Sequence, residues 1–338
     1  MDASLVITIL KQFESFNCNN RSDLAQGMKK ILFFILFLLS YVFFISPAWT
    51  ESETSPFLAS MLNKAVPTIV QEISDDLPEW VKRTDFTLDF QEDLKPLWSF
   101  ETIQPLYRSR DTFRHTIFIQ DRYAHTSVDD TINIGFGYRY FTPDENWLLG
   151  VNSFYDYAFD RRHKRYGMGA EIISKFASVH ANYYEAFSSW RYYMETGGAV
   201  QEKALDGWDV EGKMQVPYMP WIQAAFKGYG WQGEKHNDVE GYSMSCLMNI
   251  TRNIVLEFGR NDDDVGENNF IKVSFTIGGP RRVEYTMIDN FFMPTMFTTY
   301  DLKRKTLSKV RRHHDIVVEK VRTSRGTGGG GVFIGRGT

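Results

Sequence analysis

The most constraining feature of this chain is an alternation of apolar and polar residues that recurs in many segments between Thr84 and Ile277. Each segment is about ten residues long, and turn residues separate it from the next. The clearest runs from Thr131 to Phe141, where Ile, Phe and Tyr occupy every second position and Thr, Asn, Gly and Arg fill the positions between. Successive side chains of a β-strand point to opposite faces, so each segment has one apolar and one polar face.

A long series of such segments predicts a transmembrane β-barrel, whose apolar face contacts lipid and whose polar face lines the lumen. We expect an all-β, antiparallel outer-membrane barrel of about twelve strands over residues 84–277. The polar face carries charges of both signs, which can pair inside a lumen, whereas on lipid each would cost roughly 2–4 kcal/mol at mid-depth. The expected strands are Thr84–Gln91, Leu97–Leu106, Thr112–Arg122, Thr131–Phe141, Trp147–Phe159, Arg165–Lys175, Ala177–Phe187, Gly207–Pro217, Trp221–Trp231, Glu240–Ile250, Asn253–Arg260 and Asn268–Ile277.

The lengths of the connections provide an independent check. In a barrel with a periplasmic N-terminus, the even-numbered connections are short turns and the odd ones longer outward loops. Thr142–Asn146 and Tyr218–Pro220 are brief even connections. The longer odd connections are Asp121–Asp130, Ser188–Asp206, Gln232–Val239 and Asn261–Glu267. A soluble β-sandwich follows no such rule.

The region before the barrel predicts secretion. The apolar stretch Ile31–Ile45 follows two lysines and precedes a small-x-small sequence, which indicates a signal peptide cleaved near Ala48. Residues 1–48 are therefore expected to be this signal with an N-terminal extension, and Met28 lies where a signal peptide ordinarily begins. We expect residues 49–83 to form a short periplasmic helical segment.

Composition adds little about partners. The chain has 38 basic and 42 acidic side chains and a net charge of −4, so we expect no nucleic-acid partner. The mean hydropathy of −0.33 argues against a helical membrane protein, while half of each barrel strand is polar. Aromatic residues make up 15% of the chain, which suits two interfacial girdles.

Several motifs resemble the translocator domain of the intimin/invasin family, the inverse autotransporters. Asn133 to Phe141 fits the pattern N-x-G-x-G-x-R-x-F, Gly150 to Asp156 fits G-x-N-x-F-x-D, and Gly167 to Glu171 fits G-x-G-x-E. Gly207 to Val210 matches a G-[WF]-D-[IV] strand, and Leu77 to Val81 resembles the Trp-containing segment that precedes the first strand. The similarity covers roughly Leu77 to Val318.

The resemblance implies an outer-membrane translocator of type V secretion, inserted by the barrel-assembly machinery with the help of periplasmic chaperones. In this family a linker returns through the lumen and carries an adhesive passenger that can meet a host receptor. Residues 278–321 match that linker in place, and Tyr300, Asp301 and Leu302 resemble its short helical turn. We expect residues 322–338 to be a Gly-rich tail without a passenger domain. Phe275 and Ile277 would close the barrel, as the aromatic-x-apolar end of such strands does.

Several residues on the polar face are candidates for a structural role in the lumen. The glycines either make room for something inside the pore or allow the barrel to curve, and the charged residues predict an inward ion-pair network. These candidates are Gly135, Gly137, Arg139, Asp156, Gly167, Gly169, Glu171, Asp209 and Glu211.

We expect no catalytic, cofactor-binding or metal site. A barrel phospholipase needs a serine activated by histidine in an H-x-S-N-G sequence, which neither His115 nor His180 has. Asp160 and His163 in a charged loop are the nearest match to a barrel protease, and a solvated loop explains them better. His313 and His314 lack further zinc ligands at a suitable spacing. The alternatives that remain are a passive small pore and a degenerate or truncated translocator.

Overall fold

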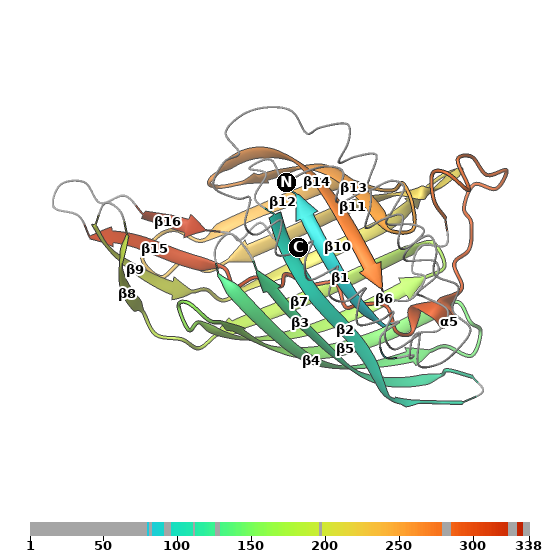
Figure 1. The fold of residues 1–338 in the computed structure, drawn as a ribbon, viewed down its shortest axis with the longest axis horizontal. Coiled ribbons are helices and arrows are strands. Elements are labelled where there is room, and N and C mark those ends of the chain that lie inside the picture. The colour runs from blue at the N-terminus through green and yellow to red at the C-terminus, as the bar shows by residue number, and fades with distance from the viewer. Residues whose placement is uncertain are drawn as a thin grey trace, which may run out of the picture. The chain divides into compact units, whose positions relative to one another are not determined.

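The computed structural model describes residues 80, 83–90, 96–110, 112–125, 129–195, 198–278, 285–323 and 330–333. Among them, twelve antiparallel strands close into a barrel (Figure 1), which confirms the predicted fold class. The strands follow one another around the barrel in sequence order, except that β7 pairs directly with β10. The barrel strands are β1 (Thr84–Phe90), β2 (Pro96–Arg108), β3 (His115–His125), β4 (Asp130–Phe141), β5 (Trp147–Ala158), β6 (Lys164–Ser174), β7 (Ala177–Ala186), β10 (Gly207–Val216), β11 (Met219–Trp231), β12 (Val239–Asn249), β13 (Ile254–Asp263) and β14 (Gly266–Gly278).

The barrel closes where the first strand meets the last. In the β1–β14 register, Leu88 lies opposite Phe275 and Phe86 lies opposite Ile277. The two residues expected at barrel closure thus belong to the closing strand pair, although the Ile277 side chain lies outside what the structure describes. Closure leaves the barrel without a free sheet edge, as backbone in a bilayer requires.

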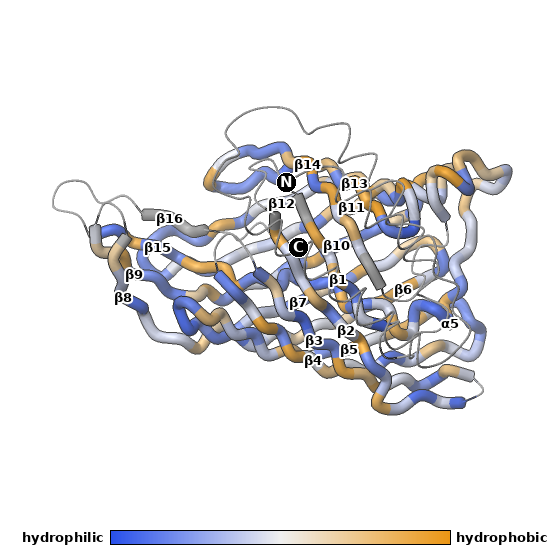
Figure 2. Tube along the Cα trace, in the orientation of Figure 1, coloured by the Kyte–Doolittle hydropathy of each residue, from blue (hydrophilic) through white to orange (hydrophobic). Residues whose placement is uncertain are grey.

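Burial alternates along the strands as the hydropathy does. In β4, Ile134 and Phe136 are 39% and 55% exposed, whereas Asn133 and Arg139, which have the opposite parity, are completely buried. Figure 2 shows the same alternation as orange and blue stretches along the barrel strands. Large apolar side chains at every second position would be a liability in water, so they fit a surface that contacts lipid.

The connections lie at two rims. We call the rim with the even-numbered connections, such as β4–β5 and β6–β7, the first rim, and the opposite rim the second rim. The expected loop at 261–267 is wrong in extent, because β13 and β14 continue to a two-residue connection at Asp264 and Val265. In residues 261–268 the two strands remain paired, although most of their side chains are polar. The expected loop at 121–130 is likewise mostly strand, since β3 extends to His125.

A second sheet includes two strands of the longest connection, for which the sequence predicted only a loop. Within 188–206, β8 (Arg191–Glu195) and β9 (Gly198–Ala204) form a hairpin. It is joined by β15 (Val318–Thr323) and β16 (Gly330–Phe333) in the order β16-β15-β9-β8, and Figure 1 shows red β15 beside olive β9. Within the expected Gly-rich tail, residues 330–333 form β16 and pair with β15.

Helix is nearly absent from the described chain. Its one multi-residue helix, α5 (Leu302–Lys305), begins at Asp301, whose side chain accepts a hydrogen bond from the Lys303 backbone N–H. No helix in the described ranges has the length and apolarity needed to cross a bilayer. The expected signal peptide, its cleavage near Ala48 and nearly all of the expected segment 49–83 fall outside the described residues.

Candidate functional site

After β14 the chain runs along the first rim. The backbone N–H of Met287 donates to the Asn249 carbonyl at 2.8 Å, and that of Tyr300 donates to the Lys175 carbonyl at 2.9 Å. Both acceptors belong to ends of strands at this rim. The segment therefore passes from one connection to the next before it reaches α5.

The three predicted linker residues sit where this path turns into the lumen. The Tyr300 hydroxyl donates to the Pro220 carbonyl, and Asp301 caps α5. Leu302 is buried in a cluster with inward side chains from the barrel. The remaining members of that cluster are Phe141, Leu148 and Ile173.

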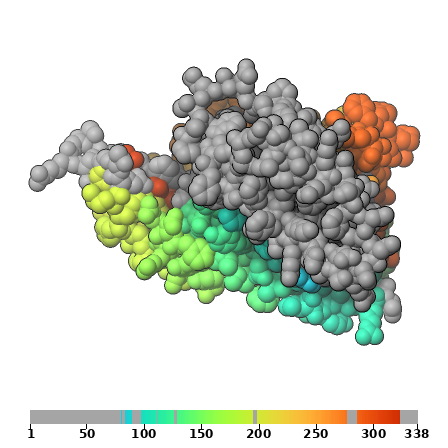
Figure 3. Space-filling model, viewed as in Figure 1, coloured from blue at the N-terminus to red at the C-terminus, as the bar shows by residue number. Residues whose placement is uncertain are grey.

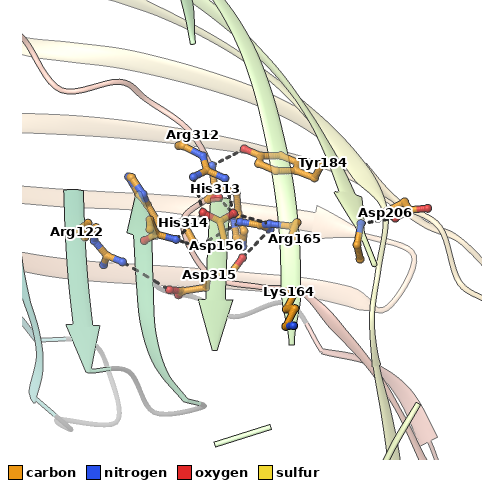
Figure 4. A network of polar contacts seen from close by, with 12 residues as sticks. Arg122, Asp156, Lys164, Arg165, Tyr184, Asp206, Arg312, His313, His314 and Asp315 are labelled. Atoms are coloured by element: carbon orange, nitrogen blue, oxygen red, sulfur yellow. Dashed lines mark hydrogen bonds and ion pairs between the residues drawn. The ribbon is translucent and has the colours of Figure 1, made fainter. Parts of the chain in front are cut away.

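Residues 306–317, which we call the lumen segment, are enclosed by inward-facing side chains. Asp156 of β5 is the centre of the contacts (Figure 4). Its carboxylate binds the Arg312 guanidinium in a bidentate pair at 2.7 and 2.6 Å. It also accepts hydrogen bonds from Arg165 at 2.9 Å and Asn133 at 2.8 Å. Since the side chains of Asp156 and both arginines are at most 1% exposed, these charges are compensated within the protein and not by water.

The barrel also holds the backbone of the lumen segment. Arg165 donates to the carbonyls of His313 and Asp315, both at 2.8 Å, and Asn133 donates to the His314 carbonyl at 3.0 Å. Backbone carbonyls are present in any sequence, so these bonds fix the path of the chain with little regard to its side chains. Figure 4 shows Arg165 and Asp156 facing these residues from neighbouring strands.

A second holding point lies nearer the first rim. Arg139 of β4 donates through Nε to Glu171 of β6 at 2.5 Å. The same guanidinium donates through Nη1 to the carbonyls of Thr306 and Ser308. An arginine neutralised by a wall carboxylate thus repeats the arrangement at Arg165.

The other two predicted acidic residues lie on β10, where Glu211 contacts the lumen segment directly and Asp209 holds wall side chains that contact it. Asp209 accepts hydrogen bonds from the Tyr184 hydroxyl at 2.6 Å and from Asn182 at 2.8 Å, and Glu211 accepts one from Arg311 at 2.6 Å. Tyr184 in turn accepts a hydrogen bond from the His313 backbone N–H at 2.7 Å, as Asn182 donates to the Arg311 carbonyl.

The predicted glycines lie under bulky groups that meet the lumen segment. A Cβ on Gly135 would lie 2.2 Å from the Phe154 ring, and one on Gly137 would lie 2.1 Å from the Phe118 ring. Both rings belong to a buried cluster with Leu307 of the lumen segment. These glycines make room for the side chains on which the segment packs.

The other pair of predicted glycines is equally crowded. A Cβ on Gly167 would lie 2.8 Å from Arg312 Nη2 itself. One on Gly169 would lie 2.5 Å from the Asn182 side chain and 2.7 Å from Asn152. Gly167 is therefore the point at which the wall most directly makes space for the lumen segment.

The structure brings some predicted residues together and separates others. Arg139 and Glu171 form a direct pair, whereas Asp156 pairs with Arg165 and Arg312. Sequence analysis did not single out Arg165, Tyr184 or Arg312. Strand parity placed Arg165 inward, but no signal in the sequence gives its partner 150 residues away.

The chain leaves the lumen between two second-rim connections. Leu205 donates its backbone N–H to Val317 at 3.0 Å, and β15 then pairs along β9. The Glu319 carboxylate accepts hydrogen bonds from the backbone N–H groups of Glu234 at 3.1 Å and Lys235 at 2.9 Å, and from the His236 ring at 2.6 Å. Although its burial acts to raise the pKa of Glu319, these hydrogen bonds hold that pKa below its ordinary value.

Glu202 of β9 completes this exit. It accepts hydrogen bonds from His163 at 3.0 Å and Tyr193 at 2.7 Å, and Lys320 of β15 lies 3.3 Å away. Burial opposes ionisation of this group, but the hydrogen bonds from His163 and Tyr193 and the charge of Lys320 lower the pKa of Glu202. At the exit, the buried carboxylates of Glu319 and Glu202 therefore tie β15 and β9 to the neighbouring connections of the second rim.

The lumen segment leaves part of the lumen open. A cavity of about 1170 Å³ remains, lined by residues 307–314, by residues of β1–β3 and of the β6–β7 hairpin, and by many polar side chains of β10–β14. Those side chains include Lys213, Gln223, Ser243, Ser245 and Glu257. In the described ranges, no group of three or more His, Cys, Asp or Glu residues is placed to hold a metal ion.

Comparison with known proteins assigns the chain to a family. The family model described as inverse autotransporter, beta-domain, matches residues 46–278. A putative attaching and effacing protein homolog of Escherichia coli (strain K12) is 30% identical over 193 residues, which are 57% of this chain and 62% of that protein. The inverse autotransporter adhesin YeeJ of the same organism is 30% identical over 153 residues, or 44% of this chain and 6% of that protein. The chain thus spans less than two thirds of either relative.

A solved structure has the same fold. It was reported in "Unveiling the Mechanism Behind the in-meso Crystallization of Membrane Proteins" and superposes with a TM-score of 0.57 at 16% identity, covering 70% of this chain and 99% of that one. The family match and the closed twelve-stranded barrel place the chain in the bacterial outer membrane. Since the family model covers more than half of its residues, the chain belongs to the inverse autotransporters, a family of outer-membrane translocators and adhesins.

Proposed function

We propose that the barrel exports its own C-terminal segment through the lumen and anchors it at the cell surface. The observation that carries this proposal is the path of residues 285–323, which begins at the first rim, is enclosed by Arg139, Asp156 and Arg165, and continues at the second rim as β15. The first rim is then periplasmic and the second rim extracellular. The barrel-assembly machinery and periplasmic chaperones would deliver the barrel to the membrane.

The contacts to the lumen segment support export better than they support a fixed plug alone. Arg139, Arg165 and Asn133 bind backbone carbonyls, which every residue of a passing chain offers. Side-chain recognition involves three basic residues of the segment. Arg312 binds Asp156 in a bidentate pair, Arg311 binds Glu211, and Lys309 lies 2.7 Å from both Asp85 and Glu101. A wall that holds the backbone generally and these basic side chains specifically suits a segment that moves and then stops at a defined register.

Surface exposure of the C-terminus tests the proposal. An epitope tag after Thr338 should be accessible to antibody and removed by protease on intact cells. A matched tag inserted at Asp144, in the exposed β4–β5 turn of the first rim, should stay protected until the outer membrane is opened. If the C-terminal tag is protected while the 188–206 connection is cleaved, the translocator proposal is wrong.

A displayed segment could serve adhesion, since one relative is an adhesin by name. We propose that any such role belongs to the exposed chain after β15 and the second-rim connections, with a host receptor as partner. Binding of tagged cells to host cells, compared with cells that make the barrel without residues 324–338, tests this role separately from export.

A passive pore is the second candidate, and the open part of the lumen favours it. The cavity of about 1170 Å³ is lined by polar side chains, as a water-filled path requires. Single-channel conductance of the purified barrel should be small for the full chain and larger when residues after Gly278 are removed. Equal conductance of the two forms would show that the lumen segment does not obstruct the pore.

A further inference from the structure

A small cleft at the second rim lies outside the lumen and takes no part in export. It has a volume of about 370 Å³ and lies between the β5–β6 connection and the start of β8. Three arginines, Arg161, Arg162 and Arg191, line it together with Asp160 and the rings of Trp190, Tyr192 and Tyr193. Figure 3 shows this end of the described chain, where the yellow-green and yellow surface of β8 and β9 adjoins green strands.

The positive charge of the cleft is not neutralised. No ion pair joins any of the three arginines to a carboxylate among the described side chains, and Asp160 is the one acidic residue of the lining. The Arg161 guanidinium lies 3.5 Å from the centroid of the Tyr193 ring, and Arg191 donates to the Arg162 carbonyl at 3.3 Å. The Arg191 Nε is buried and has no hydrogen-bond partner. Elsewhere at this rim, by contrast, Arg260 is paired with Glu267.

The cleft is already shaped without a ligand. Asp129 accepts hydrogen bonds from the backbone N–H groups of Asp160 at 2.8 Å and Arg161 at 3.2 Å. Arg162 has a positive φ of 56°, and His163 is held between Ser188 and Glu202 at 3.0 Å each. Because its two walls are fixed by the chain itself, little ordering would be needed on binding.

The cleft lies at the level expected for lipid headgroups. Just below it, outward aromatic rings form a cluster in which Tyr166 and Phe187 stack at 4.7 Å and Phe159 is 45% exposed. Such rings mark the membrane interface of a barrel. Arg161 follows Phe159 by two residues within the β5–β6 turn, so the cleft and these rings lie at the same rim.

We propose that this cleft binds the phosphate groups of an anionic glycolipid in the outer leaflet. Arginine forks match phosphate oxygens, and the unpaired charges supply the attraction. The Tyr192 ring, 73% exposed, offers a flat face to a sugar, and the apolar barrel wall below accommodates acyl chains. The inference rests on the proposed function only for its orientation, which places the second rim outside.

Lipid A, the phosphorylated glycolipid of the outer leaflet, is the probe. Native mass spectrometry of the full chain in detergent should show bound bisphosphorylated lipid A and weaker binding of its dephosphorylated form. Each arginine near an anionic lipid surface contributes about 1 kcal/mol, or roughly fivefold in affinity. The triple variant Arg161→Gln, Arg162→Gln, Arg191→Gln should therefore bind about one hundredfold more weakly.

Two variants control for folding and for net charge. The triple Arg→Lys variant keeps the charge but loses the guanidinium forks, so it should bind more tightly than the Gln variant and more weakly than the unmodified chain. Arg260→Gln, which alters a neutralised arginine at the same rim, should bind as the unmodified chain does. Heat-dependent mobility in gels verifies that each barrel is folded.

Three results would overturn the proposal. The first is unchanged lipid A binding in the triple Gln variant, and the second is a loss of binding in Arg260→Gln as large as in that variant. The third is displacement of lipid A by inorganic phosphate or a soluble polyanion as effectively as by unlabelled lipid A. Because lipid binding is measured in detergent, its failure leaves the test of tag exposure untouched. Failure of tag exposure likewise leaves this measurement standing.

Discussion

Asp156 is the residue on which the lumen contacts depend most directly. It faces Arg165 of the wall and Arg312 of the lumen segment at once, and all three side chains are buried. A buried pair contributes little over an apolar replacement, but removal of one partner leaves a buried charge uncompensated. The role of Asp156 is therefore to make the position of Arg312 specific.

We predict that Asp156→Asn weakens docking of the lumen segment by about 3–5 kcal/mol, because two guanidiniums lose their carboxylate. Hydrogen exchange of the backbone N–H groups of residues 310–315 should become faster, together with protease cleavage in the same segment. Asp144→Asn, in an exposed turn, is the control and should change neither. Unchanged exchange in Asp156→Asn would mean that backbone contacts alone hold the segment.

The lumen glycines permit a similarly direct test. Gly137→Ala would place a methyl group 2.1 Å from the Phe118 ring, so that ring must shift within the cluster it shares with Val310 and Leu307. Overpacking of this kind costs typically about 1–3 kcal/mol, and we expect a lower unfolding temperature in heat-mobility gels. Gly212→Ala is the matched control, because an added Cβ there meets no atom within 4 Å. Equal effects of the two changes would point to barrel curvature instead of packing.

Residue parity explains which of these features a sequence can reveal. Alternation predicted that Arg139, Asp156 and Glu171 point inward, because the face of a residue depends only on its neighbours in the strand. It could not predict that Asp156 meets Arg312, since that contact depends on where a distant segment enters the lumen. Partners within one barrel wall follow strand register: Gly150 lies opposite Arg139 on one side and Glu171 on the other, so these two side chains meet across it.

At the scale of elements, the barrel strands were predictable and the second sheet was not. Each barrel strand shows a hydropathy pattern imposed by lipid on one side and water on the other. Neither β8 nor β9 lies in the barrel wall between lipid and lumen, so their residues lack the alternation of apolar and polar side chains. The pairing of β9 with β15 joins segments more than 100 residues apart, which no local signal encodes.

The exit of the chain should respond to acid through Glu319. Hydrogen bonds from His236 and from backbone N–H groups hold the pKa of Glu319 below its ordinary value of 4.5 despite burial. A group with a lowered pKa stabilises the folded state above its ordinary pKa, and that contribution is lost as pH falls through the lowered value. We therefore predict that β15 is held firmly at neutral pH and loosens below about pH 4.5.

Hydrogen exchange of Lys320 and Val321, corrected for the intrinsic effect of pH, measures this loosening. Glu319→Gln should be loose at neutral pH and lose most of the added response to acid. The control Glu234→Gln changes an exposed carboxylate that binds Lys203 and Trp190 and keeps the backbone N–H that donates to Glu319, so it should keep that response. A response to acid of the same size in Glu319→Gln would assign the effect to another group, such as Glu202.

At the scale of the whole molecule, the lumen is divided between a packed and an open side. The lumen segment fills the side formed by β3–β7, where the glycines and the bulky rings lie. The side formed by β10–β14 keeps polar side chains around the cavity. This division explains how one barrel can both hold a chain firmly and offer a water-filled space. It also provides a test of the whole arrangement, because the side chains of β12 should point alternately to the cavity and to lipid.

Ser245 and Cys246 are adjacent on β12 and lie on opposite faces by parity. Ser245 lines the cavity, whereas Cys246 lies opposite Ala224 and Phe258 on the alternate face, where Phe258 is 43% exposed. In a chain with Cys18→Ser and Cys246→Ser, a Ser245→Cys variant should react with a charged, membrane-impermeant thiol reagent, because water in the cavity carries the reagent to it. Cys246 in membranes should react only with a lipid-soluble reagent, since lipid covers it and disfavours the thiolate that such reagents require. Both positions must label equally in detergent-denatured protein. If the charged reagent instead modifies Cys246 and spares the cysteine at 245, lipid and lumen lie on the reverse faces, and the assignment of every inward residue from Gly135 to Glu211 fails with it.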